Sequence, residues 1–229
     1  MKQVIASIVK KIKTLKRGNS LAEFAVTTAV MATLAATAAP RLSELSEGAK
    51  AEKTFEHMDK IIKQAGNFYQ RTADWEGRGR FPGQEKFNHS VGGEGHSYWN
   101  DNASTEGLAE ARQRSADHHE AVLKDLGLYD GADGWRQFDH HKEVDWYSVF
   151  GEAGGEEKLH DASLSTINDH QQQEWLSLFG YEALFSPYQD GHYAYTVVAG
   201  GGSGDDVFPP VIYVVDIENA VHYNNVLTP

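Results

Sequence analysis

The histidines are the side chains of this sequence best suited to bind a metal ion. Eleven are present, and two adjacent pairs stand out, His118-His119 and His140-His141. Acids that supply oxygen ligands lie beside both pairs: Asp117, Glu120, Asp139 and Glu143. Neighbouring residues on a helix point about 100° apart, however, and no His-Glu-x-x-His spacing occurs. The pattern favours solvated or hydrogen-bonded histidines, and we predict no cofactor.

Two pairs of aspartates are candidates for calcium loops, Asp130 with Asp133 and Asp205 with Asp206, although neither pair has the EF-hand pattern. Catalytic motifs are lacking, because the sequence has no Gly-x-Ser-x-Gly, P-loop or dinucleotide fingerprint. Five tryptophans are present, and for most of them we expect a place in an aromatic core. We therefore predict a protein that is not an enzyme.

Charge is distributed unevenly along the 229 residues. The formal net charge is −12, and since residues 1–18 carry +6 without any acid, the remaining residues carry −18. Phosphates would be repelled by so acidic a body, so no nucleic-acid partner is expected. The chain has no cysteine, which excludes disulfides and thiolate zinc sites.

Residues 21–39 form an apolar run, rich in Ala and Thr, directly after the basic stretch. As a helix this run reaches about 28 Å, close to the thickness of a bilayer's hydrocarbon core. We expect one membrane crossing with the basic side in the cytoplasm. A secretory signal peptide cut after Ala36-Thr37-Ala38 is the alternative. Glu23, the one acid of the run, is costly in lipid and implies a partner.

Apolar residues continue at helical spacing beyond Pro40 as far as Tyr69. The pairs Glu56–Lys60 and Asp59–Lys63 have the favourable i,i+4 order. A cleaved signal peptide would not run into such a helix. We predict one helix over 19–70, bent at Pro40, with 19–40 as a membrane or filament segment and 41–70 amphipathic.

Residues 71–229 are predicted to form an acidic globular head. A helix is expected over Thr105–Leu126, with an inner face of Leu108, Arg112, Ser115, His119, Val122 and Leu126, and a short one from Asn168 or Asp169 to about Phe179. Three strands are expected over 192–198, 211–217 and 221–227, the last two as a hairpin across 218–220. The glycine run 200–204 with Asp205 and Asp206 is predicted to be a long flexible loop.

The N-terminal landmarks resemble the class III signal of type IV pilins and type II secretion pseudopilins. The residues that carry this resemblance are Lys16-Arg17-Gly18-Asn19-Ser20-Leu21-Ala22-Glu23-Phe24, with Pro40 farther on. The resemblance implies cleavage by prepilin peptidase between Gly18 and Asn19, which makes residues 1–18 a leader, Glu23 the fifth mature residue and Pro40 the twenty-second. In this family the residue at Asn19 is usually Phe. The implied fold is α+β and pilin-like, with the outer half of the long helix packed on a C-terminal antiparallel sheet and extra short helices in the head.

The resemblance further implies a structural subunit that is made as an inner-membrane precursor, with its head outside the cytoplasm, and is then assembled into a periplasmic or extracellular filament. Its partners would be the membrane, prepilin peptidase, an inner-membrane assembly platform, and copies of itself or other pilins. Glu23 and Pro40 would be the assembly residues. A surface pilus and a secretion pseudopilus both remain open. The alternative from a different class is a periplasmic enzyme or metal-binding domain held by a signal anchor.

Overall fold

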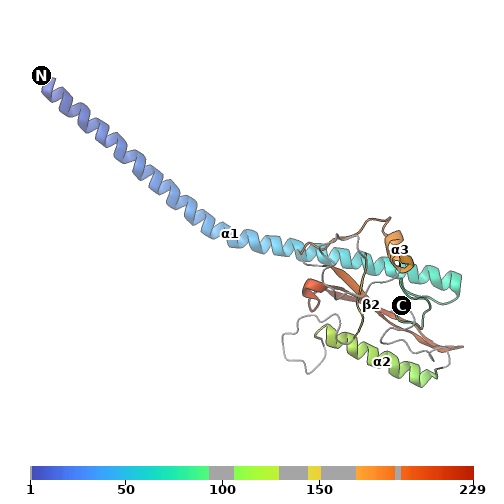
Figure 1. The fold of residues 1–229 in the computed structure, drawn as a ribbon. Coiled ribbons are helices and arrows are strands. Elements are labelled where there is room, and N and C mark those ends of the chain that lie inside the picture. Colours follow the sequence, from blue (N-terminus) through green and yellow to red (C-terminus); the bar gives the residue numbers. More distant parts are fainter. Residues whose placement is uncertain (1, 93–105, 129–143, 151–168, 189–191) are drawn as a thin grey trace. The chain divides into compact units, whose positions relative to one another are not determined.

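The structure is a computed structural model that describes residues 2–92, 106–128, 144–150, 169–188 and 192–229, with side chains described from residue 21 onward except at 169–172. The chain forms two compact units, Met1–Ala51 and Glu52–Pro229. One helix, α1 (Lys2–Glu76), contributes to both and ends beyond the predicted residue 70 (Figure 1). Helical structure continues through Pro40, even though a proline cannot donate the hydrogen bond to residue 36.

The second unit also contains two shorter helices, α2 (Leu108–Asp125) and α3 (Asp169–Leu178). Four strands form its main sheet, β1 (Tyr147–Ser148), β2 (Tyr193–Val198), β5 (Val211–Asp216) and β6 (Asn224–Leu227). They lie in the order β1-β2-β5-β6, and every neighbouring pair is antiparallel. This arrangement confirms the predicted α+β layout of a long N-terminal helix and a C-terminal antiparallel sheet.

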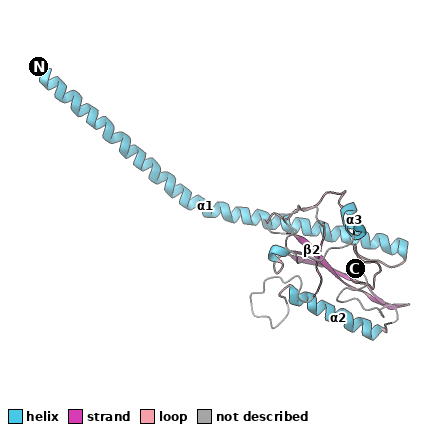
Figure 2. Ribbon diagram, viewed as in Figure 1, coloured by secondary structure: helices cyan, strands magenta, loops and turns pink. Residues whose placement is uncertain are grey.

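Both faces of the sheet are covered by helices, as Figure 2 shows for α1 and α2 on opposite sides of the strands. On one face, Met58, Ile61 and Ala65 of α1 pack in a core with Tyr195 and Ile212. On the other face, residues of α2 pack in a second core with residues that alternate with these along the strands, namely Ala194, Val198, Val211 and Val215. Since successive strand residues point to opposite faces, β2 and β5 supply both cores from near-continuous apolar sequences.

Two predictions for the C-terminal third were wrong. The glycine run is a second, two-stranded sheet of β3 (Gly201–Ser203) and β4 (Asp206–Phe208), not a long flexible loop. Gly202 permits this hairpin because its φ is +91° and a Cβ there would lie 1.9 Å from the carbonyl oxygen of Asp206. The connection between β5 and β6 is also longer than 218–220, because a short 3₁₀ helix, η2 (Ile217–Asn219), and a turn precede Asn224.

The inner face of α2 differs from the predicted one by a rotation of the helix. His118, Ala111 and Ala121 are buried, whereas Arg112 is exposed and His119 is half-buried. Ser115, Val122 and Leu126 are buried as predicted. Both histidines of the pair can approach the sheet from α2, and the sequence pattern alone did not distinguish which of them is covered completely.

Candidate functional site

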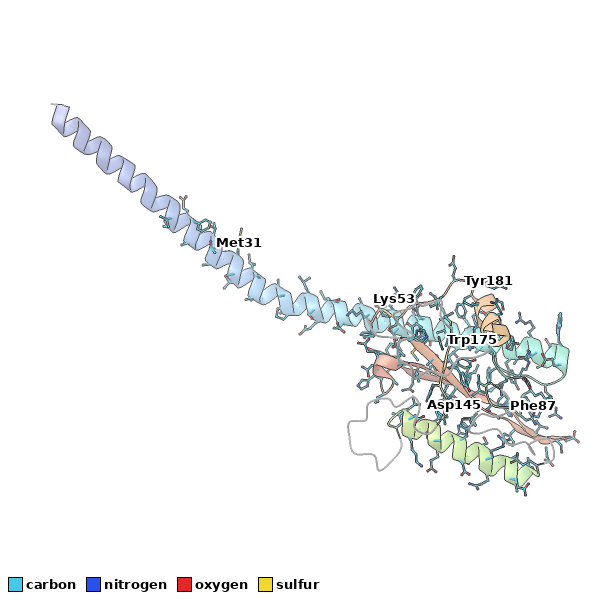
Figure 3. All side chains as sticks on the ribbon, viewed as in Figure 1. Met31, Lys53, Phe87, Asp145, Trp175 and Tyr181 are labelled. Atoms are coloured by element: carbon cyan, nitrogen blue, oxygen red, sulfur yellow. The ribbon has the colours of Figure 1, made fainter. Side chains whose placement is uncertain are left out.

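The large apolar side chains of the segment Leu21–Ala39 are exposed along α1. At least half of the surface of each of the following is exposed: Leu21, Phe24, Val26, Val30, Met31 and Leu34. Figure 3 shows Met31 projecting from the helix. The helix is long and apolar enough to cross a membrane, so this segment is a candidate membrane span. A contiguous exposed apolar surface of this kind is typical of membrane or protein interaction sites.

The threonines of this segment do not expose unsatisfied hydroxyl groups. Each hydroxyl donates to a carbonyl oxygen one turn earlier: Thr27 to Glu23 at 2.9 Å, Thr28 to Phe24 at 2.7 Å, Thr33 to Ala29 at 2.6 Å and Thr37 to Thr33 at 2.9 Å. Polar groups in lipid are costly unless they are paired, and these hydroxyls are paired inside their own helix. The threonines are therefore compatible with either lipid or a dry helix bundle.

Glu23 is the one ionisable residue of the segment, and its side chain is exposed. It forms no ion pair with any residue whose side chain the structure describes. Its backbone carbonyl accepts the Thr27 hydroxyl, but that bond leaves the carboxylate unpaired. Such a carboxylate would need a cation as partner only where lipid or other helices covered this surface.

The other predicted processing and assembly residues lie on the same helix. Gly18 and Asn19 are within α1, and Pro40 follows the apolar segment inside the same helix. Of these three, side-chain surroundings are described only for Pro40, which is exposed. Gly18, Glu23 and Pro40 therefore lie along one continuous helix.

The histidines of α2 occupy different environments. His118 is buried, and burial lowers its pKa to about 3, so it is neutral in the folded protein. The Nδ1 atom of His119 lies 2.9 Å from the Tyr213 hydroxyl of β5, and burial lowers the pKa of His119 as well. His119 is thus hydrogen-bonded, as the sequence pattern suggested.

No cluster of three or more metal-ligating side chains occurs within the described ranges. Several predicted candidates lie outside those ranges: His140, His141, Asp130, Asp133, Asp139 and Glu143. The calcium candidates Asp205 and Asp206 lie at the exposed tip of the β3–β4 hairpin. Two adjacent carboxylates at an open tip do not surround a cation with the six to eight oxygens that calcium takes.

The tryptophans divide between core and surface. Trp146 and Trp175 are fully buried, and Figure 3 shows Trp175 among the side chains of the second unit. Trp75, in the last turn of α1, is 87% exposed, so the predicted core role is wrong for this residue. Trp99 and Trp135 lie outside the described residues.

A buried polar cluster in the sheet was not found by sequence reasoning. Ser148 of β1 and the ring of His192, just before β2, are hydrogen-bonded. Beside them, Asp216 accepts the Ser186 hydroxyl at 2.7 Å and the Glu218 amide at 3.3 Å. Asp216 also accepts a hydrogen bond from the backbone amide of His192.

This cluster connects three segments of the second unit. Tyr188 N–H donates to the Ser186 hydroxyl at 3.1 Å, and Tyr188 and Tyr223 share a hydroxyl contact of 2.8 Å. The polar groups therefore hold the segment before β2 against the end of β5. The available sequence signal for this cluster was the acidic residue directly after the apolar run Val211–Val215.

No family model, no curated protein and no solved structure matches this chain.

Proposed function

We propose that the chain is the structural subunit of a type IV pilus-like or pseudopilus filament and assembles through its N-terminal helix. The observation that carries this proposal is the segment Leu21–Ala39, an exposed apolar helix surface with internally paired threonines and a single unpaired carboxylate, Glu23. Subunits that leave a membrane for a filament need a surface suited to both environments. Small residues along the segment favour this, because they allow helix backbones to approach closely.

The proposed life cycle begins with a precursor in the inner membrane. Its basic leader, residues 1–18, stays on the cytoplasmic side and the acidic head lies outside the cytoplasm. Prepilin peptidase cuts between Gly18 and Asn19, and an inner-membrane platform then moves the subunit into the filament. The acidic heads form the filament exterior, where their charge governs surface contacts.

Glu23 has a specific proposed partner. Cleavage after Gly18 creates a cation, the α-amino group of Asn19, at the start of the same helix. Residue five of the mature chain is more than one turn from that amine, so the amine of a neighbouring subunit is the better partner. In a water-poor bundle the loss of one partner costs about 3–5 kcal/mol, compared with about 0–1 kcal/mol for an exposed pair.

The deciding experiment compares Glu23→Ala with Glu44→Ala in the full chain. Both remove one exposed carboxylate from α1, but Glu44 lies beyond Pro40. We expect Glu23→Ala to leave a processed, folded, membrane-held monomer and to abolish filaments or sharply reduce them. Glu44→Ala is expected to assemble normally. Electron microscopy of sheared surface material, followed by mass spectrometry of the subunit, measures the yield.

Normal filament yield for Glu23→Ala would remove Glu23 from the assembly mechanism and leave helix packing as its basis. Absence of filaments from the unmodified chain, together with an intact N-terminus, would favour the signal-anchored periplasmic domain instead. Neighbouring genes distinguish the two filament types, since a secretin with a secretion platform indicates a pseudopilus and a retraction ATPase indicates a pilus.

A further inference from the structure

Two exposed leucines lie on α1 just beyond the candidate membrane segment. Leu42 and Leu45 follow Pro40 and are 65% and 70% exposed. The apolar run Leu21–Ala39 already reaches about 28 Å, close to the thickness of a bilayer's hydrocarbon core. Lipid tails that cover this run therefore do not also cover the two leucines. Single exposed leucines are ordinary, but these two are one helical turn apart and belong to a longer pattern.

The two leucines continue a heptad pattern that begins inside the membrane segment. Positions alternately three and four residues apart run from residue 21 to residue 49, four heptads farther on. The large members are Leu21, Phe24, Met31, Leu42 and Leu45, and positions 28, 35, 38 and 49 hold one threonine and three alanines. All of these residues are exposed, and Met31 is labelled in Figure 3. We call this set of positions the heptad stripe.

Beyond Pro40 the heptad stripe is bordered by polar residues. Residues 41–51 contain no other large apolar side chain. The opposite side of the helix carries Glu47 and Lys50, with Lys50 Nζ 3.0 Å from Glu47 Oε1. Pro40 occupies the heptad position farthest from the stripe, so its missing hydrogen bond lies on the outer side of the helix. One apolar side and one polar side are typical of a helix that packs against a partner.

The extent of the heptad stripe selects a membrane-spanning helix as this partner. The stripe begins within the apolar run and ends beyond it, so neither lipid nor a soluble protein can cover its whole length. A second copy of this chain fits, because every copy carries the same basic leader and crosses the membrane in the same direction. The apolar runs of two copies lie at the same depth, so neighbouring helices are parallel and in register. Each stripe then faces the same residues of the other copy.

We infer that two copies of this chain pair in the membrane, before a filament forms, as a parallel dimer along the heptad stripe. The alanines at 35 and 38 allow the helix backbones to approach, and Leu42 and Leu45 pair outside the lipid. Left-handed supercoiling compensates for the drift of about 20° per heptad of a straight helix. Glu23 lies off the stripe, so it stays available to the amine of a further copy. The inference rests on the membrane topology of the proposed function but not on filament assembly.

Disulfide cross-linking of the full chain in membranes tests the dimer, because the chain has no cysteine. Leu45→Cys places a thiol on the heptad stripe, and Glu47→Cys is the matched control on the outer side; both positions are exposed in a single copy. A disulfide needs Cα atoms about 4.4–6.8 Å apart. Outer positions of two helices whose axes are about 8–10 Å apart are separated by more than about 12 Å. We expect several-fold more dimer from Leu45→Cys after mild oxidation.

A second substitution tests the stripe without moving the thiol. In the Leu45→Cys chain, Leu42→Glu places two like charges opposite each other and is expected to lower the dimer yield several-fold. Ser43→Glu adds the same charge beside the stripe and is expected to leave the yield unchanged. An equal yield in both double variants would overturn the inference.

The order of pairing and assembly is tested with Gly18→Leu, for which we expect neither processing nor filaments. Combined with Leu45→Cys, it should give the same cross-link, and a cross-link found only in filaments would overturn the inference. A product whose mass is not twice that of the subunit would assign the stripe to a different membrane protein and overturn it too. Normal filaments with equal cross-linking of Leu45→Cys and Glu47→Cys would refute the dimer alone. A specific dimer in a chain that forms no filaments would support the dimer and refute the proposed function.

Discussion

Arg80 and Glu174 form an ion pair that joins the segment after α1 to α3, with Nη1 of the arginine 2.9 Å from Oε1 of the glutamate. Only 14% and 12% of the two side chains are exposed. The second oxygen of Glu174 accepts the Gly83 amide at 2.9 Å. One carboxylate thus fixes both the arginine and the backbone of the loop, which in turn covers the core at Phe81.

We expect Glu174→Gln to lower the free energy of unfolding by about 1–2 kcal/mol, because it removes one of the two carboxylates that pair with the largely buried guanidinium of Arg80, the other being Glu76. The matched control is Glu182→Gln, an exposed acid after α3, for which we expect a change of no more than about 0.5 kcal/mol. Urea unfolding of the full chain in detergent, followed by the fluorescence of buried Trp146 and Trp175, measures both. Equal midpoints for the two variants would contradict a role for the pair.

Elements with strong local patterns were predicted well from the sequence. The starts and ends of α2, α3, β2 and β5 lie within a few residues of the predicted ranges, since each contains a helical or β-rich run bounded by turn residues. The prediction for the glycine run 200–204 was wrong because the same composition suits both a flexible loop and a tight hairpin. Long-range contacts decided between them, including the Arg114 bond to Gly200.

Long-range partners also explain what was missed around the candidate sites. The pattern of Glu23 and Pro40 could be recognised from the sequence because it depends only on spacing along one helix. The hydrogen bond from Asn225 to Asp59 could not be predicted, because the two residues lie 166 positions apart in the sequence. The Asp216 cluster likewise combines residues from separate segments that only the fold brings together.

Acid is expected to destabilise the protein through His118. Its folded-state pKa is about 3, below the ordinary value of 6.5, because burial disfavours the charged form. The unfolded chain therefore binds this proton first as the pH falls, and stability is lost between pH 6.5 and about 3. The contribution is about 1.4 kcal/mol per pH unit. Burial lowers the pKa values of His57, His89 and His119 as well, which acts in the same direction.

The measurement is the free energy of unfolding between pH 4 and 7 for His118→Gln and for the exposed control His222→Gln. We expect a flatter profile for His118→Gln and an unchanged one for His222→Gln. Asp216 acts in the opposite direction, because burial raises its pKa to about 6 and its protonation favours the folded state below that value. A profile of unchanged slope in His118→Gln would show that this histidine is already charged or solvated.

The β3–β4 hairpin is expected to depend on Gly202 more than on Gly204. Both have a positive φ, +91° and +64°, so alanine is strained at either position. A Cβ at Gly202 would also lie 1.9 Å from the Asp206 carbonyl oxygen, whereas no atom lies within 4 Å of the corresponding position at Gly204. Thermal unfolding should therefore show a larger loss for Gly202→Ala, with about 1 kcal/mol for Gly204→Ala. A similar loss in both variants would mean that the hairpin rearranges without cost.

The mature N-terminus is expected to be Asn19. Gly18 lies between a basic leader and the apolar segment, and Glu23 is the fifth residue after it, so one cut removes the leader charge and creates the amine that we propose as the partner of Glu23. N-terminal sequencing of protein from the membrane fraction tests this. Gly18→Leu is expected to retain Met1 and form no filaments, whereas Gly48→Leu, on the same helix with no atom within 4 Å of its Cβ position, should be processed normally. A mature start at Ala39 or Pro40 would identify ordinary signal peptidase, and the helix that carries the filament proposal would then be absent from the mature protein.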